Sequence, residues 1–171
     1  MALALATEGP FERIVATDIS AAALALAAEN AAITGVSGKI EFRHGSLLEP
    51  IRISEQFDVI VSNLPYIAQE EFVGLAPEVR DWEPREALVA EDRGLALVLA
   101  LVREAGAALL PGGLLALEVG STQTGVVADH IRGTGGFGEP EILMDLSRRE
   151  RIVLAVCDGS QVENVRRPSG N

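Results

Sequence analysis

The chain has 171 residues, enough for one domain with a single hydrophobic core. Apolar residues make up 48% of it, which excludes wholesale disorder, and no apolar run reaches the roughly 18 residues that a membrane-spanning helix needs. The formal net charge is −11 and Lys39 is the only lysine, so the chain is poorly suited to contact nucleic-acid phosphates directly.

Two further features favour a cytoplasmic location. The only cysteine, Cys157, cannot form an internal disulfide, which is typical of a reducing compartment. The first ten residues, MALALATEGP, lack the basic start of a signal peptide and have the composition of a helix. We therefore predict a cytoplasmic protein with no membrane partner.

Short apolar segments predict the strands of a sheet. In chain order they cover residues 14–16, 40–43, 57–62, 114–119, 141–145 and 151–157. The third, FDVIVS, is β-branched and apolar on both faces, which is typical of a parallel strand buried within a sheet. The last two are joined by a short polar turn and must pair antiparallel, because a parallel return needs a long crossover.

Helical segments lie between these strands. Ser20 is a suitable N-cap for a helix that runs to about Thr34, where Gly35 ends it. A long Ala/Leu helix is predicted over residues 94–110, stopped by the Pro-Gly-Gly that follows, and an amphipathic helix over residues 122–132. This alternation predicts an α/β sheet with helices on both faces.

The chain contains no internal repeat and no linker before its last dozen or so residues. We therefore predict one domain over residues 1–157 and a polar, disordered tail over residues 158–171.

The tetrapeptide Asn63-Leu64-Pro65-Tyr66 directly follows the strand FDVIVS. Ligands of open α/β sheets lie beyond the carboxyl ends of the strands. At that place, the Asn63 side-chain oxygen and the Leu64 carbonyl would accept the two N–H hydrogens of a planar amide or amine, orienting its nitrogen toward a methyl donor. Pro65 would stiffen the loop and Tyr66 would stack on the target group. The alternative is a plain strand-ending turn, in which Asn and Pro are common.

Asp18 ends the first predicted strand and precedes a helix. An acidic residue at this place often accepts hydrogen bonds from ribose hydroxyls, although a helix-capping role explains it equally well. After the next strand, His44-Gly45-Ser46-Leu47 could border an adenine, but by itself it reads better as a surface loop.

Other constellations predict no further chemistry. His44 and His130, with a single cysteine, make no metal site, and no G-x-S-x-G nucleophile elbow is present. Three arginines near the last strand could pair with acidic side chains, but a solvated hairpin turn explains them better. These are Arg148, Arg149 and Arg151.

Taken together, these residues resemble the release-factor glutamine N5-methyltransferases, the HemK-like family. Asn63–Tyr66 stands where the family has Asn-Pro-Pro-Tyr. The more specific stretch Glu78–Leu88, EVRDWEPREAL, resembles the family's E-x-R-x-x-E-P-x-x-A-L. Further similarity lies in Leu117–Gly120 followed by Gln123, and in Asp145, Arg149 and Arg151 before the final strand.

The resemblance implies a Rossmann-like class I methyltransferase sheet with a terminal antiparallel β-hairpin. It implies S-adenosyl-L-methionine as cofactor and, as substrate, the glutamine of the Gly-Gly-Gln motif in peptide chain release factors. Asn63, Pro65 and Tyr66 would be catalytic, and Leu64 would join them in binding the substrate. The cofactor would be bound by Asp18, Ile19, Ser46, Leu47 and Asn63.

The chain also departs from the family. Family members have a strand and a glycine-rich loop before a helix that reads like Ala2–Ala6, and this chain begins inside that helix. We therefore expect a partial catalytic domain without that first strand, which an upstream segment or a partner chain would complete. Leu64 replaces a proline, and Ser46 replaces the usual aspartate.

Two alternatives remain open at this stage. Asn-Leu-Pro-Tyr also resembles the motif of ribosomal-RNA adenine dimethylases, so the target could be a nucleic-acid adenine N6 atom, although the net acidity argues against it. The other alternative is an inactive truncated fragment, or a non-catalytic module that binds a partner through an exposed sheet edge.

Overall fold

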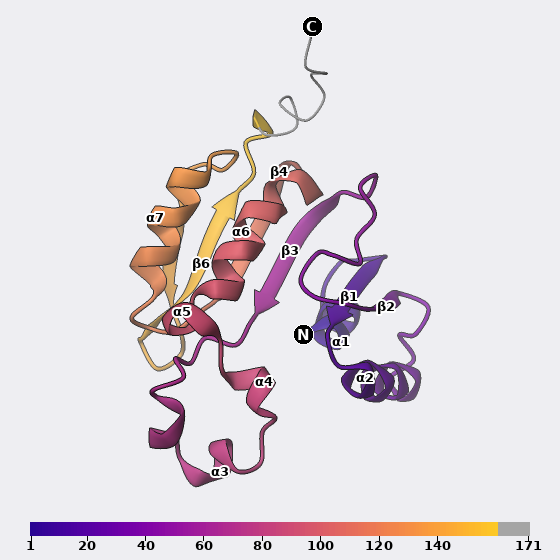
Figure 1. Ribbon diagram of the computed structural model, residues 1–171. Helices are drawn as coiled ribbons and strands as arrows, with labels where there is room; N and C mark the ends of the chain where they lie inside the picture. The colour runs from indigo at the N-terminus through magenta and orange to yellow at the C-terminus, as the bar shows by residue number, and fades with distance from the viewer. Residues whose placement is uncertain (161–171) are drawn as a thin grey trace, which may run out of the picture. The chain divides into compact units, whose positions relative to one another are not determined.

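The computed structural model describes residues 1–160 of the protein (Figure 1). The predicted tail lies outside this part from residue 161 onward. The chain forms two compact units, Met1–Ile53 and a second unit that begins at Ser54, and each is described by itself. No helix within residues 1–160 is long and apolar enough to cross a membrane.

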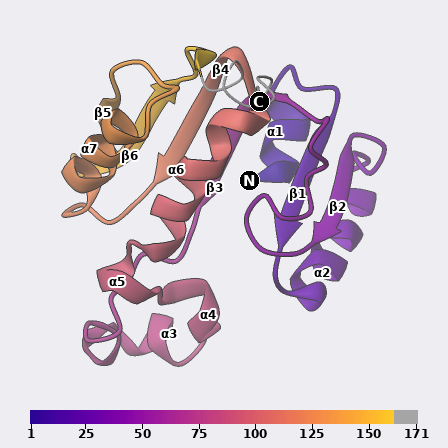
Figure 2. The ribbon, with the colours of Figure 1, turned by 45° about the horizontal axis from the view of Figure 1, so that its top comes forward.

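The first unit pairs two parallel strands with two helices (Figure 2). Its elements in chain order are α1 (Ala2–Glu8), β1 (Ile14–Asp18), α2 (Ala21–Ile33) and β2 (Ile40–His44). The strands pair in register from Ile14 opposite Ile40 to Asp18 opposite His44. A small core forms where the helices cover the strands, from Ala6, Ile14, Ala31, Val36 and Ile40.

Local chemistry sets the bounds of α2. The Ser20 hydroxyl accepts a hydrogen bond from the Ala23 N–H at 3.2 Å, which satisfies one of the free donors at the helix start. Gly35 adopts a φ of +73° just after the helix, a conformation that glycine reaches without steric cost. The predicted cap and terminator are both confirmed.

The second unit is built on a four-stranded sheet of order β3-β4-β6-β5. The strands are β3 (Phe57–Asn63), β4 (Leu109–Glu118), β5 (Glu141–Met144) and β6 (Glu150–Val156). Strand β3 runs parallel to β4, whereas β6 is antiparallel to both of its neighbours. The predicted terminal antiparallel hairpin is therefore confirmed.

Helices α6 (Ala96–Ala108) and α7 (Thr124–Thr134) pack on this sheet and on each other (Figure 1). Apolar side chains from α6, α7, β4 and β6 form the main core. Its largest fully buried members are Val102, Leu109, Leu115, Leu117, Val119, Val127, Ile131, Val153 and Cys157.

The bounds around β4 differ from the sequence prediction. The helix predicted to reach residue 110 ends at Ala108, and the strand predicted to start at 114 starts at Leu109. The Pro-Gly-Gly segment is drawn into the sheet because Gly112 N donates to Cys157 O, and Cys157 N donates to Gly113 O, both at 2.8 Å. Helix α7 also begins and ends two residues later than predicted.

The burial predicted for β3 is wrong. Within the described residues this strand pairs only with β4, so it is the edge of its sheet, and Val61 is 38% exposed. Strand β1 likewise pairs only with β2 among the described strands. The described strands thus form a two-stranded and a four-stranded sheet.

A segment of short helices connects β3 to α6. It contains η1 (Phe72–Gly74), α3 (Pro77–Arg80), α4 (Arg85–Leu88) and α5 (Glu91–Gly94). An isolated parallel bridge between Ile67 and Val89 brings its two ends together. The segment thus forms a loop whose two ends meet beside the carboxyl end of β3, as Figure 2 shows.

Candidate active site

Asp18 lies where the sequence places it, at the carboxyl end of β1 and opposite His44 of β2. Its Oδ1 accepts a hydrogen bond from Ser20 N at 2.8 Å. No described residue donates to its other oxygen, Oδ2, and the side chain is exposed. Asp18 therefore has an acceptor free for the hydroxyls of a sugar.

The two loops beyond β1 and β2 are tied together. His44 Nε2 lies 2.9 Å from the Ile19 carbonyl, a contact that places the ring proton on Nε2. Thr17 Oγ1 donates to the Leu47 carbonyl at 2.9 Å, and Leu47 is held in a left-handed conformation with a φ of +47°. Asp18, Ile19, Ser46 and Leu47 are thereby brought to one edge of the first unit.

Sequence reasoning missed two residues that hold these loops. It left His44 in a plain surface loop and did not consider Thr17, yet both hold the loops that carry the predicted cofactor residues. Their positions at the ends of adjacent parallel strands were the available signal.

Asn63 ends β3 opposite Glu118 of β4, and Leu64-Pro65-Tyr66 continues beyond the sheet. Within residues 1–160, neither the Asn63 side chain nor the Leu64 carbonyl has a hydrogen-bond partner. Two oxygen acceptors on adjacent residues are thus free at the carboxyl end of a parallel strand. This arrangement can bind a group with two N–H hydrogens.

Tyr66 borders a pocket of about 600 Å³ in the second unit. The pocket is lined by Tyr66, Ile67, Glu71, Gly74, Leu75 and Arg151. The guanidinium carbon of Arg151 lies 5.2 Å from the Tyr66 ring centroid, within the range of a cation–π contact. A planar group entering here would meet an aromatic ring, a cation and a carboxylate.

Arg151 corrects the interpretation of the three arginines as solvated. It lies in β6, within the strand predicted over residues 151–157, and its Nη1 donates to the Val119 carbonyl at 3.3 Å. The antiparallel pairing of β6 with β4 carries this side chain to the carboxyl end of β4, beside Tyr66.

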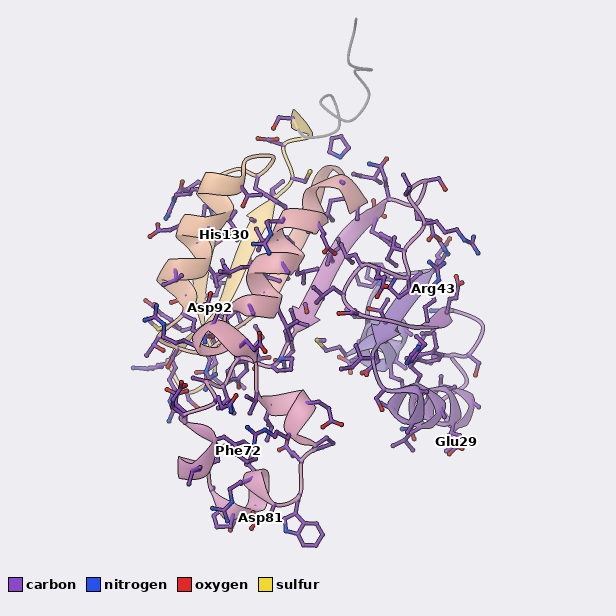
Figure 3. The ribbon with its side chains drawn as sticks, viewed as in Figure 1. Glu29, Arg43, Phe72, Asp81, Asp92 and His130 are labelled. Atoms are coloured by element: carbon purple, nitrogen blue, oxygen red, sulfur yellow. The ribbon has the colours of Figure 1, made fainter. Side chains whose placement is uncertain are left out.

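The stretch Glu78–Leu88 contributes through its backbone. Ile67 N donates to Leu88 O at 3.0 Å, and Ala90 N donates to Ile67 O at 3.1 Å. Leu88 itself is buried, and the guanidinium carbon of Arg85 lies 4.7 Å from the centroid of the Phe72 ring, which Figure 3 labels. The stretch therefore anchors the residue that directly follows Tyr66.

Each unit offers groups that suit one part of a methyl-transfer reaction. In the first unit, a carboxylate with a free oxygen beside the exposed apolar side chain of Ile19 suits a nucleoside, such as that of S-adenosyl-L-methionine. In the second unit, the Asn63 and Leu64 oxygens can accept from a nitrogen that carries two N–H hydrogens. Among the described residues, no three His, Cys, Asp or Glu side chains gather as a metal-binding group.

The parallel strands, the terminal hairpin and the polar loop after β3 define a Rossmann-like methyltransferase domain. Residues 1–82 match a family model described as "Methyltransferase domain". The fold is similar to that of a methyltransferase from Pyrococcus furiosus, with a TM-score of 0.65 and 19% identity over 92% of this chain and 68% of that one. A ribosomal protein L11 methylase from Lactobacillus delbrueckii has a TM-score of 0.55 and 22% identity over 85% and 57%.

Sequence comparison shows which proteins of this class the chain resembles. The chain is 44% identical to the release factor glutamine methyltransferase of Cereibacter sphaeroides over 155 residues, which are 91% of this chain and 55% of that protein. It is 41% identical to that of Moorella thermoacetica over 91% of this chain and 54% of that protein. The chain is therefore similar to the release factor glutamine methyltransferases over most of its length, and it spans about half the length of these relatives.

Proposed function

We propose that the protein carries out methyl transfer from S-adenosyl-L-methionine to the side-chain amide of a glutamine, within the Gly-Gly-Gln motif of a peptide chain release factor. The free pair of acceptors at Asn63 and Leu64 carries this proposal, because a primary amide has two N–H hydrogens to donate. The names of the relatives support the same substrate. Since that substrate acts in translation, we propose a cytoplasmic location.

The difficulty of the reaction lies in the amide nitrogen, whose lone pair is delocalised into the carbonyl. The Asn63 oxygen and the Leu64 carbonyl would bind both N–H hydrogens and fix the plane of the amide. Pro65 limits the motion of the Leu64 carbonyl, and the Tyr66 ring would stack on the amide plane.

The cofactor, when bound, supplies a methyl group on a sulfonium sulfur. Transfer of this methyl group to the amide nitrogen would leave the sulfur as a neutral thioether and release one of the two N–H protons to water. Asp18 would hold the ribose, with Ile19, Ser46 and Leu47 beside the adenine and Asn63 near the transferred methyl. The protein residues thus contribute orientation and hydrogen-bond acceptors.

The direct test is transfer of a labelled methyl group to a class I release factor, alongside a release factor whose motif glutamine is replaced by alanine. We expect labelling of the first protein only. Asn63→Ala should lower kcat by roughly 100-fold, because one of two orienting hydrogen bonds is lost at the reacting atom. The matched control Asn30→Ala, on the exposed face of α2, should leave kcat unchanged.

The alternatives make different predictions in the same assay. Labelling of RNA in place of the release factor would support the adenine N6 target. Saturable protein binding without cofactor binding would support the non-catalytic module.

A further inference from the structure

Gln123 lies beside the Asn63–Tyr66 loop, and the proposed reaction does not use its side chain. It is 8% exposed, and its amide makes three hydrogen bonds. Oε1 accepts from Gly120 N at 2.9 Å, while Nε2 donates to Tyr66 O at 2.9 Å and to Arg93 O at 3.0 Å. Both N–H hydrogens of the amide are therefore used on backbone carbonyls.

The three partners of Gln123 belong to different parts of the second unit. Tyr66 follows β3 and Gly120 follows β4. Arg93 lies in α5, the short turn directly before α6. The next residue after Tyr66, Ile67, is hydrogen-bonded through both its N–H and its carbonyl to the Leu88–Ala90 segment. The peptide group between Tyr66 and Ile67 is thus fixed at the Tyr66 oxygen and at the Ile67 nitrogen.

The turn that contains Arg93 has an unusual backbone conformation, which brings it close to Tyr66. Asp92, Arg93 and Gly94 have consecutive φ values of +51°, +53° and +81°, so three residues in a row are left-handed. A Cβ at Gly94 would lie 2.0 Å from Tyr66 O and 2.7 Å from Gln123 Nε2. Such a conformation persists only where its surroundings hold it, and here it brings the backbone against Tyr66.

We propose that Gln123 is a positioning residue for the Asn63–Tyr66 loop. By fixing the carbonyl of Tyr66, it sets the backbone angle that aims the Tyr66 ring and limits rotation of the Leu64 and Pro65 peptides before it. The hydrogen bonds of Gln123 go to backbone groups, so it would act through Tyr66. The role rests on the proposed function in one respect, that the loop receives the target amide.

The first test reads the loop directly and needs no activity. Tyr66 is the only tyrosine and Trp82, which is 86% exposed, is the only tryptophan. In a Trp82→Phe background, tyrosine fluorescence therefore reports on Tyr66 alone. We expect Gln123→Met to raise acrylamide quenching of Tyr66 by at least about twofold, because the loop gains motion.

Gln56→Met is the matched control. The Gln56 amide also donates to a backbone carbonyl, that of Leu109 at 3.2 Å, but it precedes β3 at the end opposite the site. Its loss should leave the quenching of Tyr66 unchanged. Unchanged quenching in a folded Gln123→Met protein, with folding checked by circular dichroism, would overturn the proposal.

Gln123→Glu supplies a second variant should the methionine variant not fold. An ionised carboxylate here faces two carbonyl oxygens, whereas a protonated one donates to one of them and still accepts from Gly120 N. Quenching of Tyr66 should therefore fall toward the unsubstituted level as the pH is lowered. A flat pH profile would contradict the positioning role.

Methyl transfer gives the third readout. In Gln123→Met, kcat should fall roughly 10-fold while the KM for S-adenosyl-L-methionine changes by less than about threefold, because orientation and not cofactor binding is lost. If the unsubstituted chain transfers no methyl group, the proposed function fails, and the fluorescence result still decides the role of Gln123. If kcat is unaffected in an active chain, the positioning role fails alone.

Discussion

Asp18 and Asn63 stand in equivalent places, each at the carboxyl end of a parallel strand. Neither is buried, and each keeps an oxygen acceptor without a partner among the described residues. Because both side chains are exposed, water satisfies these oxygens until a ligand takes its place. Their position at the carboxyl ends of parallel strands, where ligands of α/β sheets bind, is what favours a binding role over a plain strand-ending turn.

Removal of the Asp18 carboxylate tests whether Asp18 binds the cofactor. We expect Asp18→Ala to weaken binding of S-adenosyl-L-methionine by at least about 10-fold, because one or two hydrogen bonds to the ribose are lost. Asp18→Asn keeps the acceptor that holds Ser20 N and should lose less. Calorimetric titration of the full chain measures both. Glu29→Gln, on exposed α2, is the control, and equal affinities in all four proteins would remove Asp18 from the site.

Among the elements, the left-handed turn at α5 determines how closely the backbone at Gly94 approaches the Asn63–Tyr66 loop. Gly94 is the one residue of this turn that could not carry a side chain without displacing Tyr66. Arg93 contributes only its carbonyl, through the hydrogen bond to Gln123. The turn therefore couples the start of α6 to the candidate active site.

Gly94→Ala should destabilise the protein by about 1–3 kcal/mol, because the new Cβ meets the Tyr66 carbonyl and the φ is left-handed. Thermal unfolding followed by circular dichroism measures this. Gly125→Ala is the matched control, since it lies in α7, where a Cβ would meet nothing within 4 Å. The control should be neutral or slightly stabilising. A Gly94→Ala protein as stable as the control would show that the backbone of this turn can move to make room for the new Cβ.

At the scale of the whole molecule, the two units have unequal cores. The first unit buries five apolar residues, two of which are alanines. The second buries several leucines, valines and isoleucines between its helices and its sheet. Because buried apolar area is the main favourable term in folding, the second unit should be the more stable.

Native-state hydrogen exchange measures this difference. Amides of β4 and β6, each paired on both sides within the described sheet, should exchange slowest. Amides of β1 and β2 should exchange at least about 10-fold faster, because local opening of the first unit exposes less apolar surface. Equal protection of the two pairs of strands would mean that the units unfold together.

Features that depend on neighbouring residues could be predicted from the sequence. Alternating apolar and helical segments, the Ser20 cap, Gly35 and the short polar turn before β6 predicted the element order and the terminal hairpin. The Asn63–Tyr66 motif and the Glu78–Leu88 stretch predicted the similarity to the release factor glutamine methyltransferases. All of these are properties of residues close together in the chain, whose physical consequences are local.

Contacts between residues far apart in the chain became visible with the fold. Leu109–Gly113 became strand because Cys157, more than forty residues away, bonds that backbone. The apolar pattern of β3 predicted burial, but exposure depends on which strands lie beside it, and among the described strands only β4 does. Gln123, Arg93 and Arg151 meet Tyr66 through pairings that no single segment encodes. Contacts of this kind depend on sheet order and register, which arise when the whole chain packs.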